Sequence, residues 1–140
     1  MHFSTWRWEG ADNPNDGSCL LLIEARGERL LLTGDIGVVG ERQLLASGRD
    51  LRADWLLAPH HGSRGSSSAA FVAAVAPRAV LLSRAWHNPF GHPHAAVLAR
   101  YRQAGARIYD SARHGALRLL LGSHGRAEAA RAQARFWREK

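Results

Sequence analysis

The chain has 140 residues, 46% of them apolar and 22% charged, which is typical of one globular domain with a core of its own. No apolar run approaches the roughly 20 residues of a membrane span, and no leader is visible, so we expect the chain alone to be soluble. The single Cys19 excludes an internal disulfide and a cysteine-based zinc site, and its place in an apolar run predicts a buried thiol.

The charge balance points to an anionic partner. The formal net charge is +7, and all but one of the 19 basic residues are arginine. Arginine binds phosphate through two parallel hydrogen bonds, so the composition favours a nucleic acid such as DNA. The competing explanation is that these arginines lie on solvated helix faces.

Apolar runs and turn residues predict alternating strands and helices. Two Leu-rich runs, 19–25 and 28–33, flank Arg26 and Gly27 and predict a β-hairpin behind an N-terminal edge segment. The further elements expected along the chain are a helix over 38–47, a strand over 53–59, a helix over 69–75, a strand over 79–83, a helix over 93–104, strands over 107–109 and 116–121 in a closing hairpin with Gly115, and a basic helix over 126–140. This order predicts an α/β fold with a mixed sheet and flanking helices, as a domain over 1–125 with a helical tail over 126–140.

A carboxylate ends the second predicted strand. Asp35 follows Thr33 and Gly34, and a carboxylate at a strand end can bind a divalent cation. The competing explanation is an Asx turn, or a cap for the helix that starts near Val38.

Two histidines end the third predicted strand. A strand that ends in the run Pro-His-His-Gly-Ser places the imidazoles of His60 and His61 on opposite faces, so we expect only one of them to point into a given site. His60 is the favoured metal ligand because it is nearer the fixed strand, and His61 would then hold the ligand or a substrate oxygen as a catalytic residue. The reverse assignment stays open.

A hydroxyl-rich loop follows the histidines and leads into a helix. Ser63, Arg64, Ser66 and Ser67 predict a phosphate site at the helix N-terminus, and ordinary helix capping is a compatible explanation.

The run HNPFGHPH follows the next strand. In this run, Asn88 is expected to contact phosphate and His92 to act as a general acid or phosphate contact, whereas His94 is expected on the helix surface. We expect His2, His114 and His124 to be surface residues.

These motifs together resemble the C-terminal metallo-β-lactamase-like domain of ComEC-type DNA internalization (competence) proteins. The resemblance covers about residues 13–122, through Ser18 to Leu22, LLTGD, ADWLLAPHHGS, and Asn88 with GHPH. It implies an αββα sandwich and nuclease-type hydrolysis of phosphodiesters. It further implies zinc or manganese as a pair of ions in a complete domain, with Asp35 as the bridging carboxylate and His60 as the last histidine ligand. Its larger members carry membrane segments that form a channel for single-stranded DNA, which implies an inner-membrane-associated protein with this domain in the periplasm.

One part of the family pattern is missing. Metallo-β-lactamase-like sites take most ligands from an upstream H-x-H-x-D-H loop, and His2 is the only histidine in residues 1–34. We therefore expect the C-terminal half of the domain, a fragment that is not catalytic alone, whose partners are single- or double-stranded DNA and the rest of the channel protein or an upstream half-domain. The alternatives are a non-catalytic DNA-binding remnant and a stand-alone hydrolase completed by a partner chain.

Overall fold

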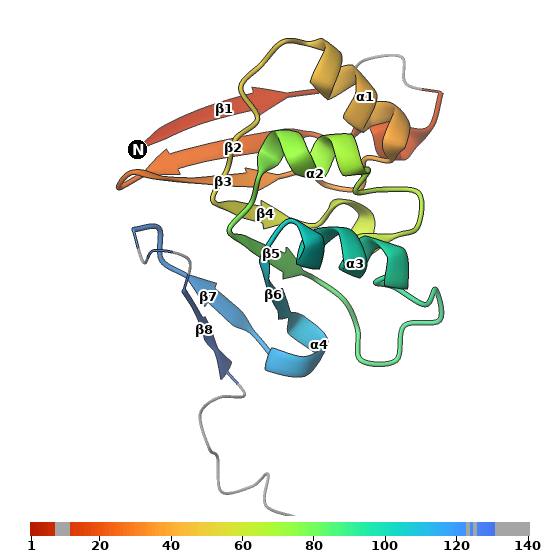
Figure 1. The fold of residues 1–140 in the computed structure, drawn as a ribbon, viewed down its shortest axis with the longest axis vertical. Coiled ribbons are helices and arrows are strands. Elements are labelled where there is room, and N and C mark those ends of the chain that lie inside the picture. Colours follow the sequence, from red (N-terminus) through yellow and green to blue (C-terminus); the bar gives the residue numbers. More distant parts are fainter. Residues whose placement is uncertain (8–11, 123, 125, 131–140) are drawn as a thin grey trace, which may run out of the picture.

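The computed structural model describes residues 1–7, 12–122, 124 and 126–130. Its main sheet has six strands in the order of the chain (Figure 1): β1 (His2–Trp6), β2 (Leu20–Ala25), β3 (Glu28–Leu32), β4 (Trp55–Leu57), β5 (Ala79–Leu82) and β6 (Arg107–Asp110). The helices are α1 (Val38–Ala46), α2 (Ala69–Val75), α3 (Ala95–Gln103) and α4 (Ser111–His114), with short 3₁₀ turns η1 (Pro14–Gly17) and η2 (Pro59–Gly62). A second sheet pairs β7 (Leu117–Leu119) with β8 (Ala127–Ala129).

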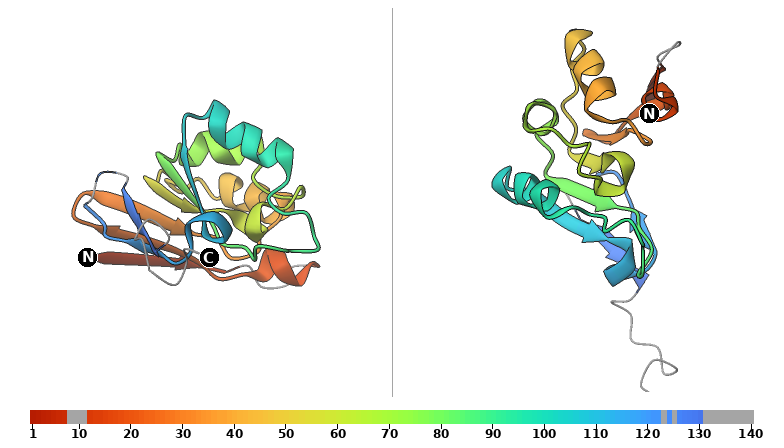
Figure 2. Two further views of the ribbon diagram at one scale, coloured as in Figure 1. Left: turned by 90° about the horizontal axis from the view of Figure 1, so that it is seen from below. Right: turned by 90° about the vertical axis from the view of Figure 1, so that its right-hand side faces the viewer.

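The sheet is mixed. The strands β1, β2 and β3 are antiparallel, and Arg26 and Gly27 make the predicted hairpin turn with φ values of 53° and 75°. From β3 to β6 the strands are parallel, and α1, α2 and α3 connect each to the next. Because such crossovers are right-handed and all step in the same direction along the sheet, the three helices cover one face, as Figure 2 shows. The C-terminal ends of β3, β4 and β5 therefore meet at one edge.

The core lies between this face and the helices. Alternate residues of the strands point toward the helices and are almost fully buried: Leu20, Leu22, Leu31, Leu56, Val80 and Leu82. The helices contribute Leu44, Phe71, Val75, Val97 and Tyr101. This burial fixes the sheet edge that carries the candidate site.

The opposite face of the sheet is only partly covered. The paired strands β7 and β8 lie on it, where the Ala127 N–H donates a hydrogen bond of 3.3 Å to the Tyr109 hydroxyl. On this face Trp55 and Ala79 are fully buried, whereas the other apolar residues of β2, β3, β4 and β5 that point to it are half-buried: Leu21, Ile23, Leu30, Leu32, Leu57 and Leu81.

Most predicted elements are confirmed within one or two residues. In α3, however, Pro93 lies outside the helix, which begins at Ala95 with His94 as its N-cap. The predicted closing hairpin around Gly115 is wrong, because α4 follows β6 and β7 pairs with β8 instead.

Two further expectations, the C-terminal helix and the buried thiol, are wrong in the part of the chain that the structure describes. Ala127–Ala129 form a strand where a basic helix was expected, and residues 131–140 of that predicted tail lie outside the described residues. Cys19 is exposed, not buried. None of the helices in the described part of the chain has the length and apolar character needed to cross a membrane.

Candidate metal and phosphate site

Three loops meet at the edge formed by the ends of β3, β4 and β5. The His60 N–H in η2 donates to the Gly34 carbonyl after β3, at 3.1 Å. The His94 N–H at the start of α3 donates to the Gly62 carbonyl, at 2.9 Å. These backbone bonds hold the predicted site residues of three loops beside one another.

Asp35 lies at this edge with a side chain that is 44% exposed. It does not cap α1, because the N-terminus of this helix is bound by Asp16, whose Oδ1 accepts from Gly37 N–H at 2.7 Å and Gly40 N–H at 3.1 Å. The helix-cap explanation for Asp35 is therefore excluded. Gly34 has a φ of +55°, and a Cβ there would lie 2.8 Å from the Ser18 Cβ, so this turn requires glycine.

The described ion-pair contact of Asp35 is with His61. The Nε2 atom of His61 lies 3.6 Å from the Oδ1 atom of Asp35. The Nδ1 atom lies 2.7 Å from the Ser83 carbonyl oxygen, which can only accept, so Nδ1 carries the proton. In the neutral ring the unprotonated Nε2 then faces the carboxylate, which is the orientation seen in metal-binding histidines.

The turn η2 explains why both imidazoles reach the same edge. His60 and His61 have φ values of 46° and 56°, so the strand ends before them and the alternation of faces does not apply. The prediction that they lie on opposite faces is wrong for this reason; their ring centroids are 6.5 Å apart. Two consecutive left-handed residues other than glycine cost roughly 1 kcal/mol or more each, and such strain is concentrated at functional sites.

His92 joins this group from the loop before α3. Its ring centroid lies 5.8 Å from that of His60. Asn88 holds the loop, because its amide donates to the His92 carbonyl at 2.7 Å and its Oδ1 accepts from the His92 N–H at 2.9 Å. Burial, followed by the charges of His60, His61 and His94, lowers the pKa of His92 below its usual value.

The predicted phosphate loop is divided between surface and interior. Arg64 is exposed and Ser63 is half-buried. Ser66 and Ser67 are fully buried, and their hydroxyls bond to the Pro59 carbonyl at 2.9 Å and the Tyr101 hydroxyl at 2.7 Å. The structure therefore gives these two serines internal contacts in place of the predicted phosphate contact.

An internal carboxylate occupies the predicted anion site at the start of α2. Glu41, fully buried on α1, accepts hydrogen bonds from the backbone N–H groups of Ser67 and Ser68. The buried roles of Glu41 and Asp16 were not predicted from the sequence. For Glu41 there was one signal, because it is an acidic residue in the first turn of a predicted helix.

The remaining histidines have local contacts. His94 caps α3 by accepting from the Ala96 N–H, and His114 accepts from the Asp110 N–H through Nδ1. His2 lies in β1 at the end of the sheet far from Asp35, since β1 pairs His2 with Glu24 and Trp6 with Leu20.

The Asp35–His61 pair matches two ligands of one cation in spacing. Two donors at about 2.1 Å from a tetrahedral ion lie about 3.4 Å apart, close to the separation found here. Within the described ranges, however, no three side chains of His, Cys, Asp or Glu are placed to hold a metal ion. The described residues thus fit part of a metal site and do not complete one.

The fold and this edge match a known class. The model of the metallo-beta-lactamase superfamily matches residues 1–87, and the chain belongs to this superfamily. This confirms the predicted partial metallo-β-lactamase-like fold, and the superfamily implies metal ions in general.

The curated relatives show which members of the superfamily the chain is similar to. It is 34% identical to the "Competence protein ComA" of Neisseria gonorrhoeae, over 96% of this chain and 22% of the relative. It is 30% identical to the "ComE operon protein 3" of Bacillus subtilis, over 74% of this chain and 13% of the relative. It is also 30% identical to the "Recombination protein 2" of Haemophilus influenzae, over 94% of this chain and 18% of the relative. The chain thus spans less than a quarter of each relative, and the predicted resemblance to a ComEC-type metallo-β-lactamase-like domain is confirmed.

Proposed function

We propose that this chain serves DNA uptake as part of a ComEC-type competence protein, and that Asp35 and His61 hold a divalent cation at one side of a nuclease-type site. The observation that carries the proposal is the orientation of His61. Its Nδ1 proton is fixed on the Ser83 carbonyl, and its Nε2 faces the Asp35 carboxylate. A ring nitrogen and a carboxylate oxygen at this spacing need a positive charge between them, either a second proton on the ring or a metal ion, and we propose that the metal ion takes this place.

His61 thus replaces His60 as our preferred ligand. His60 and His92 lie beside the pair, where a phosphate oxygen of the substrate would approach the cation. Because the pKa of His92 is lowered, we propose that it is a neutral group that accepts or passes a proton. The Ser63 N–H donates to the His60 carbonyl at 2.9 Å, and Asn88 lines a hollow together with His61 and His92. We propose that Ser63, Asn88 and the exposed Arg64 contact the DNA backbone.

The proposed metal is zinc or manganese, since one imidazole and one carboxylate suit either ion. Because the described residues offer too few donors, the others would come from the rest of the larger protein or from a partner chain. The half-buried apolar face formed by residues such as Leu21, Leu30 and Leu57 supports this, because a packed layer would remove that surface from water.

We also propose DNA as the substrate and membrane association for the whole protein, with this domain in the periplasm. The net charge of +7 and the competence relatives support DNA, single- or double-stranded.

Equilibrium dialysis of the chain against Zn²⁺ and Mn²⁺ tests the proposal. We expect Asp35→Asn and His61→Ala each to weaken cation affinity by about tenfold or more. Loss of a residue that only orients a metal ligand already lowers metal affinity by about tenfold, and loss of the ligand itself should cost at least as much. The matched control is His2→Ala, which lies at the far end of the sheet and should leave the affinity unchanged. Equal affinities for all four proteins would contradict the proposal.

The second candidate is a DNA-binding domain without a metal. The lack of a third donor among the described side chains favours it. It predicts oligonucleotide binding that weakens steeply with salt and is indifferent to Asp35→Asn, together with no measurable cation uptake.

A further inference from the structure

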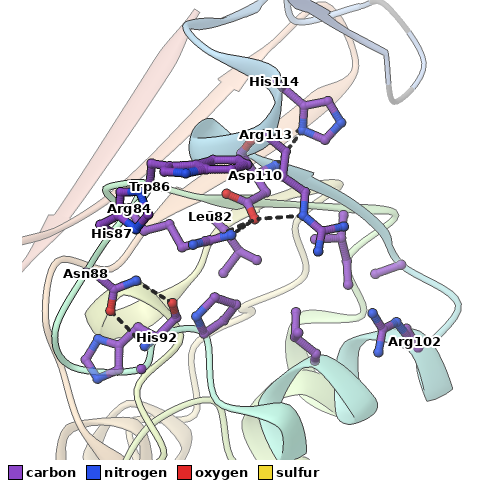
Figure 3. A pocket seen from close by; sticks show the side chains of 15 residues that line it. Leu82, Arg84, Trp86, His87, Asn88, His92, Arg102, Asp110, Arg113 and His114 are labelled. Atoms are coloured by element: carbon purple, nitrogen blue, oxygen red, sulfur yellow. Dashed lines mark hydrogen bonds and ion pairs between the residues drawn. The ribbon is translucent and has the colours of Figure 1, made fainter.

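A pocket opens directly beside the candidate site, beyond His92. It lies between the loop 84–93, α3, β6 and α4, and its volume is about 680 Å³ (Figure 3). Leu82, Leu98 and Ile108 line it with apolar surface. Such a floor suits a flat organic ring.

The rim of the pocket is strongly basic. Asp110, which is 6% exposed, is neutralised by Arg84, whose Nε and Nη2 atoms lie 3.0 and 2.6 Å from its Oδ2. Arg113 lies 3.9 Å from the same oxygen, too far for a hydrogen bond, and its side chain is 76% exposed. Arg102 is also exposed, on the wall formed by α3. Arg102 and Arg113 can therefore both bind an anion from solvent.

Exposed aromatic rings accompany these charges. Trp86 is 59% exposed at the pocket rim. Phe90 is 77% exposed and stacks on His92, with the two ring centroids 5.8 Å apart. A smaller hollow lined by His61 and Phe90 shares Arg84, Asn88 and His92 with the pocket, so one surface runs from His61 to Arg113.

We propose that this pocket binds one unpaired nucleotide of the DNA strand whose phosphate reaches Asp35 and His61. Trp86 and the apolar floor would contact the base, while Arg102 and Arg113 would bind the flanking phosphates. A nucleotide within a duplex has its faces covered by its neighbours, so the pocket would select an unpaired one. This inference rests on the proposed function for the position of the reacting phosphate.

Fluorescence anisotropy with a labelled oligothymidylate and an abasic strand of equal length tests the pocket. The two strands carry the same phosphates and differ in bases. We expect the wild type to prefer the oligothymidylate by roughly 5- to 30-fold, as one stacked base would give, and Trp86→Ala to lose that preference. Trp86→Phe should keep most of it. The double variant Arg102→Ala/Arg113→Ala should weaken binding of both strands.

The controls remove the same groups elsewhere. Phe3→Ala removes a 50% exposed aromatic ring from β1, and Arg42→Ala/Arg52→Ala removes two exposed arginines. The proposal that the pocket binds a nucleotide is contradicted if these controls change binding as much as the pocket variants do. It is also contradicted if the wild type binds the oligothymidylate no more tightly than the abasic strand. Cation uptake by the Asp35–His61 pair is measured separately, so either proposal can fail while the other stands.

Discussion

The carboxylate of Glu41 accepts a hydrogen bond of 2.8 Å from the backbone N–H of Ser68, which joins α1 to the start of α2. The neighbouring Ser67 N–H donates to the other carboxylate oxygen, and Arg100 donates to the Ser67 carbonyl at 3.0 Å. This buried carboxylate fixes the loop that follows His60 and His61. It thereby supports the site without belonging to it.

The pH dependence of stability should report on Glu41. Burial, the largest effect, raises the pKa of this carboxyl above its ordinary value of 4.5, so the native state binds the proton more tightly than the unfolded chain. Stability from this group is therefore gained as the pH falls through the raised pKa and lost as the pH rises again. The free energy of unfolding of the wild type, relative to Glu41→Gln, should increase from neutral pH down to about 4.5. Urea denaturation across this range measures it.

The control for this comparison is Glu128→Gln, whose parent side chain is 77% exposed. Its difference from the wild type should stay flat over the same range. A flat difference for Glu41→Gln as well would contradict the assignment of the raised pKa to burial of this carboxyl.

Asp16 should stabilise the loop that carries Asp35. It is 3% exposed and accepts from two N–H groups at the start of α1. Asp16→Ala leaves both donors without their acceptor and should lower the free energy of unfolding by about 1–3 kcal/mol. Asp16→Asn keeps an acceptor oxygen and should cost less. Chemical denaturation checks this, with the exposed Asp12→Ala as the control; equal stabilities of Asp16→Ala and the wild type would refute the capping role.

Gly62 should tolerate no side chain. Its φ is +82°, and a Cβ there would lie 2.7 Å from the Pro93 Cβ and 3.2 Å from a Leu82 methyl. Gly62→Ala should therefore lower the free energy of unfolding by about 2–4 kcal/mol, from strain and overpacking together. Gly105→Ala is the matched control, since its φ of +74° imposes similar strain with nothing within 4 Å of the new Cβ. If denaturant melts show equal losses for the two variants, the contact with Pro93 does not matter.

The fold could be predicted because the strands and helices are local in sequence. Leu-rich runs mark β2 and β3, and Arg26 with Gly27 marks the turn between them. The meeting of Asp35 with the histidines also follows, since parallel strands place their C-terminal ends at one edge.

The remaining details depend on contacts between distant residues. The left-handed turn at His60 and His61 is set by bonds to Gly34 and to the start of α3, which no local pattern shows. The internal use of Ser66 and Ser67 depends in the same way on Pro59 and Tyr101. The short strand β8 forms because it pairs with β7, against a local composition that favours a helix.

The most direct test of the metal site is a long-range ¹H–¹⁵N spectrum of the histidine rings during a Zn²⁺ titration. The structure predicts that His61 carries its proton on Nδ1 before the metal is added, and that its Nε2 resonance then shifts with zinc in the wild type and not in Asp35→Asn. A proton on Nε2, or a His61 ring that zinc leaves unmoved while His60 shifts, would contradict the proposal that Asp35 and His61 share a cation.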